Sequence, residues 1–153
     1  MGATTTPPSV EEINTRSLET LLGYNARRAA LAVIDVFLDR MSRYELRPVE
    51  FSVLCLIVDN PGVTSRQLCT ALGILPPNLV GLIGELERRE LVARQPHPRD
   101  GRAFGLHPTP TGRKLMSAAL RTATQLELDV GHRLTPAEHK TLLQLLQKVY
   151  KAP

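Results

Sequence analysis

Two short helical patterns joined by a tight glycine turn lie in the middle of this 153-residue chain. The first begins with residues 64–67, which have the sequence of a capping box: Thr64 caps the helix and Gln67 reaches back to it. Gly73 ends this helix, and Pro76-Pro77 opens the next one, because proline suits the first helical turn. This order predicts a helix-turn-helix, in which the second helix enters the major groove of DNA.

Longer helical patterns flank this pair. Apolar residues recur at three- and four-residue steps from residue 10 or 17 to Tyr44, which predicts one continuous first helix of roughly 40 Å. A helix of that length exceeds the core of one small domain, so part of it is expected to pack on a partner chain. A heavily apolar helix that starts at Pro48 is expected to be buried, and two more helices follow Thr109-Pro110 and Thr135-Pro136.

A basic hairpin is predicted after the second helix of the pair. Residues 91–94 and 103–106 are strand candidates, and the polar segment 95–101 is interpreted as the loop between them. Residues 88–102 contain five arginines against Glu90 and Asp100, a net charge of +3 within a chain of net charge +4. Such a segment is typical of nucleic-acid binding, with a solvated surface loop as the alternative. The hairpin is then a wing whose arginines reach phosphates or the minor groove.

Composition and motifs argue against several other classes of protein, namely zinc-binding, secreted and membrane proteins and enzymes. Cys55 and Cys69 lie in apolar helical patterns and are expected to be buried, reduced thiols, and no Cys/His cluster has zinc spacing. The N-terminal residues do not have the pattern of a signal peptide, and no run of 18 apolar residues predicts a membrane span, so a cytoplasmic protein is expected. No phosphate-cradling glycine loop and no Ser/His/Asp or paired-carboxylate arrangement is present, so we expect neither an enzyme nor a cofactor.

Residues around the hairpin carry a resemblance to a known family. Gly73-Ile74, the following helix up to Leu91-Val92, the D-x-R of residues 100–102, and residues 109–113 resemble the MarR family of bacterial regulators. That family joins its reading helix to Gly-Leu-Val and opens the next helix with L-T-x-x-G. Here Glu90 stands in place of the glycine and Pro108 in place of the leucine. The resemblance covers about residues 18–150.

The resemblance implies an α+β, mostly helical fold: a winged helix-turn-helix with long N- and C-terminal dimerisation helices. Residues 1–16 are then a flexible tail, 17–46 a dimerisation helix, 47–108 the DNA-binding lobe and 109–153 the C-terminal dimerisation helices. The implied function is that of a homodimer on a palindromic operator in double-stranded DNA. Such regulators usually repress, and a small aromatic or phenolic effector releases them.

The predicted DNA contacts fall on three segments. Arg102, the arginine of D-x-R, is expected to enter the minor groove, with Asp100 pairing with an arginine to hold the wing. Near the start of the reading helix only Asn78 can bind adenine bidentately, so base readout is expected to be thin and A/T-leaning, with shape and wing contacts as the alternative source of specificity. The full predicted set is Arg102, Asp100, Asn78, Pro77, Val80, Gly81, Arg94, His97, Arg99, Thr64, Ser65, Arg66 and Gln67.

An effector site is implied by the resemblance between the dimerisation helices and the DNA-binding lobe. Its candidate residues on the first helix are Asn25, Arg28, Arg43 and Tyr44. A cation beside apolar walls suits the carboxylate of an aromatic acid. The alternative is that these arginines are solvated or form interhelical ion pairs.

Two other interpretations stay open. One is a thiol-based redox regulator of the same fold, although that branch of the family keeps its reactive cysteine near the start of the first helix, where this chain has none. The other is a helical dimer that acts only through protein contacts, since the start of the reading helix has few polar residues. Absence of salt-dependent DNA affinity would support this last interpretation.

Overall fold

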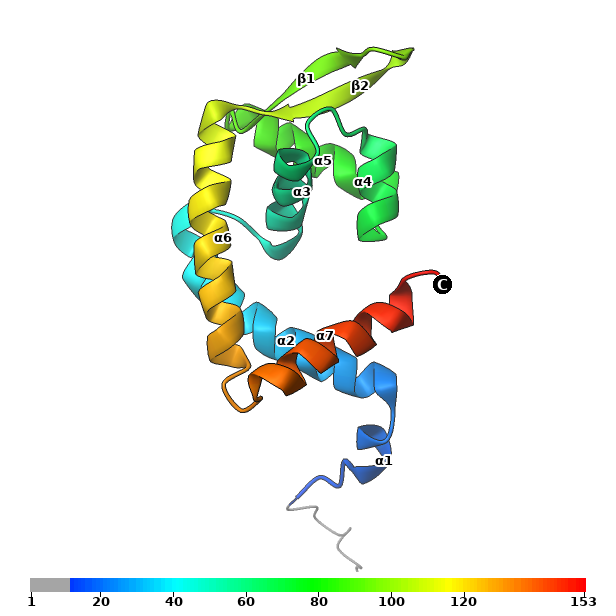
Figure 1. Ribbon diagram of the computed structural model, residues 1–153, viewed down its shortest axis with the longest axis vertical. Coiled ribbons are helices and arrows are strands. Elements are labelled where there is room, and N and C mark those ends of the chain that lie inside the picture. The colour runs from blue at the N-terminus through cyan, green and yellow to red at the C-terminus, as the bar shows by residue number, and fades with distance from the viewer. Residues whose placement is uncertain (1–11) are drawn as a thin grey trace, which may run out of the picture. The chain divides into compact units, whose positions relative to one another are not determined.

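The computed structural model describes residues 12–153, so most of the predicted tail lies outside the described residues. The fold is mostly helical with one antiparallel two-stranded sheet, which confirms the expected fold class (Figure 1). The elements in chain order are α1 (Arg16–Glu19), α2 (Leu22–Met41), the 3₁₀ helix η1 (Ser42–Tyr44), α3 (Pro48–Asp59), α4 (Ser65–Leu72), α5 (Pro76–Arg88), β1 (Val92–His97), β2 (Asp100–Pro108), α6 (Pro110–Val130) and α7 (Pro136–Tyr150). No single helix in the described part of the chain is long and apolar enough to cross a membrane.

The first helix is not continuous, contrary to the sequence-based expectation. It breaks at Thr20 and Leu21, between α1 and α2. The Thr20 hydroxyl donates to the Ser17 carbonyl at 2.8 Å, and the Asn25 amide donates to the carbonyls of Glu19 and Leu21 at 2.8 Å each. Side chains thus take carbonyl groups that an unbroken helix would use. The 20 residues of α2 span about 30 Å rather than the roughly 40 Å expected.

Contacts divide the described chain into two compact units, one that ends at residue 32 and one that comprises residues 33–153, with the boundary inside α2. In the second unit α3 lies between α6 and the α4–α5 pair (Figure 1). Val53, Leu54 and Ile57 of α3 are fully buried, which confirms that the helix after Pro48 is the buried one. The core packed around them comprises Phe37, Met41, Leu46, Leu68, Leu79, Ile83, Leu86, Leu91, Val92, Leu106, Met116, Ala119 and Leu126.

The predicted turn chemistry of the helix pair is confirmed. The Thr64 backbone N–H donates to the Gln67 side chain at 2.9 Å, and the Gln67 N–H donates to the Thr64 hydroxyl at 3.3 Å. Gly73 ends α4 with a φ of 63°, a left-handed conformation that glycine adopts without steric cost. The chain then turns through 115° between α4 and α5, within the range of helix-turn-helix motifs.

The start of α6 packs directly on the end of the reading helix. Thr109 caps α6 by accepting the Gly112 N–H at 2.9 Å, and its own N–H donates to the Leu91 carbonyl at 3.0 Å. A Cβ atom on Gly112 would lie 2.0 Å from the Leu91 oxygen. The glycine of the T-x-x-G sequence therefore has a physical reason: only a residue without a side chain permits this approach.

Glu90, which stands in place of the family's glycine, has a φ of 56°. Its side chain is exposed, and its carbonyl accepts the Thr109 hydroxyl at 2.6 Å, so the conformation belongs to the junction between α5 and the wing. A left-handed conformation costs a residue with a Cβ roughly 1–2 kcal/mol. The chain therefore carries local strain at this position.

We expect Glu90→Gly to raise the free energy of unfolding by about 0.5 kcal/mol, because relief of the left-handed strain exceeds the added entropy of the unfolded chain. Thermal unfolding should show a midpoint raised by roughly 1–2 °C. Glu127→Gly is the matched control: Glu127 is an exposed glutamate inside α6, where glycine should cost about 1 kcal/mol. Equal destabilisation by both substitutions would contradict this account of Glu90.

The wing is longer than expected, and the interpretation of residues 95–101 as a loop is wrong. Most of this segment pairs within the two strands, which leaves only Pro98 and Arg99 as the turn. Pro96 lies opposite Phe104, next to an irregularity of the register. Proline is tolerated there because both strands of a two-stranded sheet are edge strands. The base of the wing is fixed to the lobe by Leu106, whose N–H donates to the Val63 carbonyl at 2.8 Å.

Candidate nucleic-acid interface

One side of α5 is exposed at its N-terminal end. Leu79, Ile83 and Leu86 point into the core and are at most 2% exposed. The predicted reading residues share the outer side and are all exposed: Pro77, Asn78, Val80 and Gly81. The Asn78 side chain makes no hydrogen bond among residues 12–153, so its amide is free to bind a base edge.

The first turn of α4 presents fewer free groups than the sequence suggested. Thr64 and Gln67 bind each other in the capping box, at 2.9–3.3 Å. Ser65 and Arg66 are exposed, and Arg66 forms no ion pair within the described chain. These two residues are therefore the better candidates for a phosphate contact at this helix.

Arg102 is exposed near the end of the wing and has no carboxylate partner among the residues described. Contrary to expectation, Asp100 pairs with no arginine side chain among the described residues. Its Oδ1 atom instead accepts the backbone N–H of Arg102 at 3.0 Å. A short polar side chain that binds the backbone two residues ahead stabilises a turn, so Asp100 holds the backbone that presents Arg102 and leaves its guanidinium free.

Three of the five arginines in residues 88–102 bind other residues of the same chain. Arg88 pairs with Glu85, where its hydrogen bond lowers the pKa of the Glu85 carboxyl. Arg94, predicted as a DNA contact, pairs with Glu87 of α5 at 2.8 Å. The pair joins β1 to the reading helix. Within residues 12–153, Arg99 and Arg102 are then the arginines of the wing that form no ion pair.

Arg89 is the third of these arginines, and sequence reasoning gave it no role. Its guanidinium donates to the carbonyls of Tyr44 and Glu45, at 2.8 and 2.6 Å. Its side chain is only 16% exposed. Arg89 thus fixes the C-terminal end of the reading helix to the turn that follows η1. No local sequence pattern announces this contact, because its partners lie more than 40 positions away and are backbone atoms.

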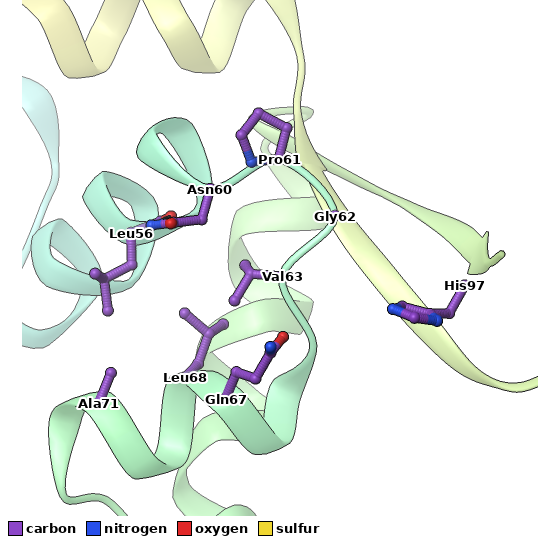
Figure 2. A pocket seen from close by; sticks show the side chains of 9 residues that line it. All are labelled: Leu56, Asn60, Pro61, Gly62, Val63, Gln67, Leu68, Ala71 and His97. Atoms are coloured by element: carbon purple, nitrogen blue, oxygen red, sulfur yellow. Dashed lines mark hydrogen bonds between the residues drawn. The ribbon is translucent and has the colours of Figure 1, made fainter. Parts of the chain in front are cut away.

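His97 lies on the inner side of the wing. It is half-buried and lines a hollow of about 400 Å³ beside α3 and α4, as Figure 2 shows. Gln67 and Leu68 of α4 line the same hollow, together with Asn60 and Gly62 of the preceding turn. The His97 Nδ1 atom accepts the Arg99 N–H at 3.3 Å. Its described contacts are therefore within the lobe, and a DNA contact by His97 stays a prediction.

The four predicted effector residues divide between the two units. Asn25 and Arg28 belong to the first, where the Asn25 amide is used in the break between α1 and α2. Arg43 and Tyr44 belong to the second, where they contact Thr122 of α6, a residue that sequence reasoning missed. Thr122 is 79 positions from Arg43 and 78 from Tyr44 in the sequence, so no periodic sequence pattern predicts these contacts.

The two cysteines are half-buried rather than fully buried, so that expectation is wrong. Burial, followed by the nearby Asp59 carboxylate 3.8 Å from the thiol, raises the pKa of Cys55. A raised thiol pKa lowers the fraction of reactive thiolate, which is unfavourable for a redox sensor. No group of three or more His, Cys, Asp or Glu side chains within residues 12–153 is placed to hold a metal ion.

Comparisons with known proteins agree with this geometry. A model of the MarR family matches residues 44–103. The solved structure of the transcriptional repressor CouR bound to a 23-mer DNA duplex is 35% identical, with a TM-score of 0.85, over 92% of this chain and 100% of that one. BpsR of Bordetella bronchiseptica, whose DNA binding is regulated by 6-hydroxynicotinic acid, is 28% identical with a TM-score of 0.80, over 87% and 95%. The repressor NicR of Pseudomonas putida is 28% identical over 97% of this chain and 95% of its own.

Proposed function

Because the chain belongs to the MarR family of transcriptional regulators, we propose that it is a repressor that a small molecule releases from operator DNA. The observation that carries this proposal is the α4–α5 pair, bent through 115° and followed by a wing with two unpaired arginines. The exposed start of α5 has the dimensions of an element that enters the major groove, and the wing suits the neighbouring phosphates or minor groove. CouR, of the same fold, has been solved on a DNA duplex.

Helix α7 supports a homodimer. It has 15 residues and a capping box at its N-terminal end, yet none of its residues is buried against the described part of the chain. An amphipathic helix is stabilised mainly by packing of its apolar face, so α7 needs a surface outside this chain. A second copy of the chain supplies such a surface at the two-fold axis of a dimer. The large exposed apolar residues of this helix are Leu142, Leu143, Leu145, Leu146, Val149 and Tyr150.

A two-fold dimer with this reading head binds a palindromic operator. The two copies of α5 then enter successive major grooves on one side of the duplex. Their half-sites lie one helical turn apart, about 34–36 Å or a multiple of it. The symmetry of the protein thus predicts the symmetry of its DNA site.

The effector is proposed to be a small hydroxylated aromatic acid or a derivative of one. This rests on two relatives: BpsR responds to 6-hydroxynicotinic acid, and CouR has been solved with p-coumaroyl-CoA, at 34% identity and a TM-score of 0.81 over 93% of this chain and 100% of that one. Release requires that the ligand favour an arrangement of the two reading heads that DNA disfavours.

Titration of the full-length protein against DNA from its own upstream region, at two salt concentrations, tests the proposal. We expect tight, sequence-selective binding that weakens as salt rises, because phosphate contacts release counterions. Sedimentation of the free protein should give a dimer. Equal affinity for any DNA, or none at all, would contradict the proposed function.

Asn78 provides a test of base readout. Asn78→Ala should cost roughly 1–3 kcal/mol at one A·T pair of each half-site, because the bidentate amide contact is lost. Operators with single base changes, titrated against wild type and variant, locate the pair: the variant should be insensitive to a change at that position alone. Affinity for unrelated DNA should stay the same, since Asn78 carries no charge. An unchanged base preference would place the reading contact elsewhere on α5.

A further inference from the structure

Three arginines surround a hollow between the end of α2, η1 and the middle of α6. The hollow has a volume of about 450 Å³. Arg40, Arg43 and Tyr44 line one side, and Arg121, Thr122 and Gln125 of α6 line the other. All of these residues belong to the second compact unit, so the hollow is formed within one body.

The charge in this hollow is not balanced. Arg40 pairs with Asp129. Arg43 and Arg121 donate only to hydroxyl groups, and neither lies within ion-pair distance of a carboxylate in the part of the chain that the structure describes. Two guanidinium charges at the mouth of a concave surface attract an anion.

Hydroxyl groups hold Arg43 in place. Its Nη2 atom donates to Tyr44 Oη and to Thr122 Oγ1, at 2.8 Å each, and its guanidinium carbon lies 4.8 Å from the centre of the Tyr44 ring. The Tyr44 hydroxyl also lies 2.9 Å from Thr122 Oγ1 and donates to the Ala118 carbonyl at 3.2 Å. The hydrogen bond with Thr122, and next the contacts and charge of Arg43, lower the pKa of Tyr44. The hollow thus contains oriented donors and a positive potential.

We propose that this hollow binds a doubly charged oxyanion, the phosphate or pyrophosphate group of the effector. Two unpaired guanidinium groups match two negative charges, and each planar fork binds two oxygens of a phosphate group. A ligand with a single carboxylate would balance the charge of only one of these two arginines. The guanidinium groups of Arg43 and Arg121 belong to the lining, so the hollow suits the anionic end of a ligand. The proposal rests on the proposed function, because it names a subsite for the molecule that releases DNA.

The hollow also has a direct connection to the reading helix. The carbonyls of Tyr44 and the next residue, Glu45, accept both hydrogen bonds from Arg89 at the C-terminal end of α5. A ligand that shifts Tyr44 therefore shifts the anchor of the reading helix. An anion bound here weakens operator binding if it favours a position of this anchor that DNA disfavours, and by linkage DNA weakens the binding of the anion by the same factor.

Calorimetric titration of the full-length protein with coenzyme A, pyrophosphate and 4-hydroxybenzoate tests the proposal. The first two probes carry phosphate groups and the third carries only a carboxylate. Arg121→Gln is the diagnostic variant, since Arg121 is exposed and its one described partner is the Ser117 hydroxyl at 3.1 Å. Arg133→Gln is the matched control, because Arg133 is an exposed arginine between α6 and α7 with no described ion pair.

We expect wild type and Arg133→Gln to bind the phosphate probes equally, and Arg121→Gln to bind them at least about tenfold more weakly. If coenzyme A binds and pyrophosphate does not, the hollow recognises a phosphate that is part of a nucleotide-bearing ligand. If both probes bind, the phosphate group alone is sufficient. Coenzyme A should raise the operator Kd of wild type more than that of Arg121→Gln. Failure of both phosphate probes to bind, equal binding by Arg121→Gln, or binding that leaves the operator Kd unchanged would overturn this assignment. Operator binding is also measured without the probes. If the protein binds its operator but the phosphate probes fail, the anion site is wrong while the proposed function stands.

Discussion

Replacing Gly112 with alanine is expected to lower the free energy of unfolding by about 3 kcal/mol or more. The new Cβ atom would lie 2.0 Å from the Leu91 carbonyl oxygen and 2.9 Å from its carbon. That carbonyl cannot turn away: it accepts the Thr109 N–H at 3.0 Å, while the Leu91 N–H donates to the Leu86 carbonyl at 2.9 Å. The start of α6 must therefore separate from the end of the reading helix. Since domains of this size are stable by roughly 5–15 kcal/mol, the variant loses a large share of its stability.

Urea and thermal unfolding measure this loss. Gly84→Ala is the matched control, because Gly84 is an exposed helical glycine of α5 whose added Cβ would meet nothing within 4 Å. Alanine there should raise stability by up to about 1 kcal/mol. A Gly112→Ala protein as stable as wild type would show that the junction of β2 and α6 yields easily, and our account of the T-x-x-G sequence would then be wrong.

Arg102→Ala should weaken operator binding by about 1–3 kcal/mol for each protomer of the proposed dimer, which is at least a several-fold loss. Arg102 is exposed on the wing, has no described carboxylate partner, and extends from a backbone that Asp100 holds at 3.0 Å. Its charge is therefore available to the minor groove or to phosphate. A protein that lacks this cation releases fewer counterions from the DNA when it binds. The slope of log K for operator binding against log salt concentration should therefore become shallower by about one unit for each protomer.

The measurement is an anisotropy titration at three or more salt concentrations. Arg133→Ala carries the same change of charge but lies beyond the far end of α6, about 30 Å along this helix from the wing, and should bind like wild type. Arg94→Ala gives a second comparison, because Arg94 is paired with Glu87. A slope equal to wild type for Arg102→Ala, together with a reduced slope for Arg94→Ala, would transfer the groove contact from Arg102 to Arg94.

Most of the features that could be predicted from the sequence depend on residues that are close to one another along the chain. The caps at Thr64 and Thr109 and the stop at Gly73 depend on residues within three or four positions of each other, so a linear pattern contains them in full. Thr135 likewise forms the predicted capping box with Glu138. The Glu138 carboxylate accepts the Thr135 backbone N–H at 2.8 Å, and this hydrogen bond lowers the pKa of the Glu138 carboxyl. The buried character of the helix after Pro48 follows from its apolar composition for the same reason.

Predictions failed where distant groups decide the structure. The pairing of Arg94 with Glu87 and the anchoring of Arg89 to Tyr44 and Glu45 depend on which elements the fold brings together. A count of arginines therefore overstated the free charge of the wing. The wing was also longer than predicted, because cross-strand pairing extended the strands through polar residues that have no strand pattern of their own.

Helix α6 runs unbroken for 21 residues, about 31 Å, from the base of the wing to the turn before α7. The Gly112–Leu91 contact and the Thr109 cap join its first turn rigidly to the reading head. A rotation of only about 10° at the α7 end therefore displaces the other end by roughly 5 Å, more than the 3.4 Å rise of one base pair. In a dimer held together by α7, α6 is a lever arm: small changes of packing at the two-fold axis move two reading heads out of step with the helical repeat of DNA.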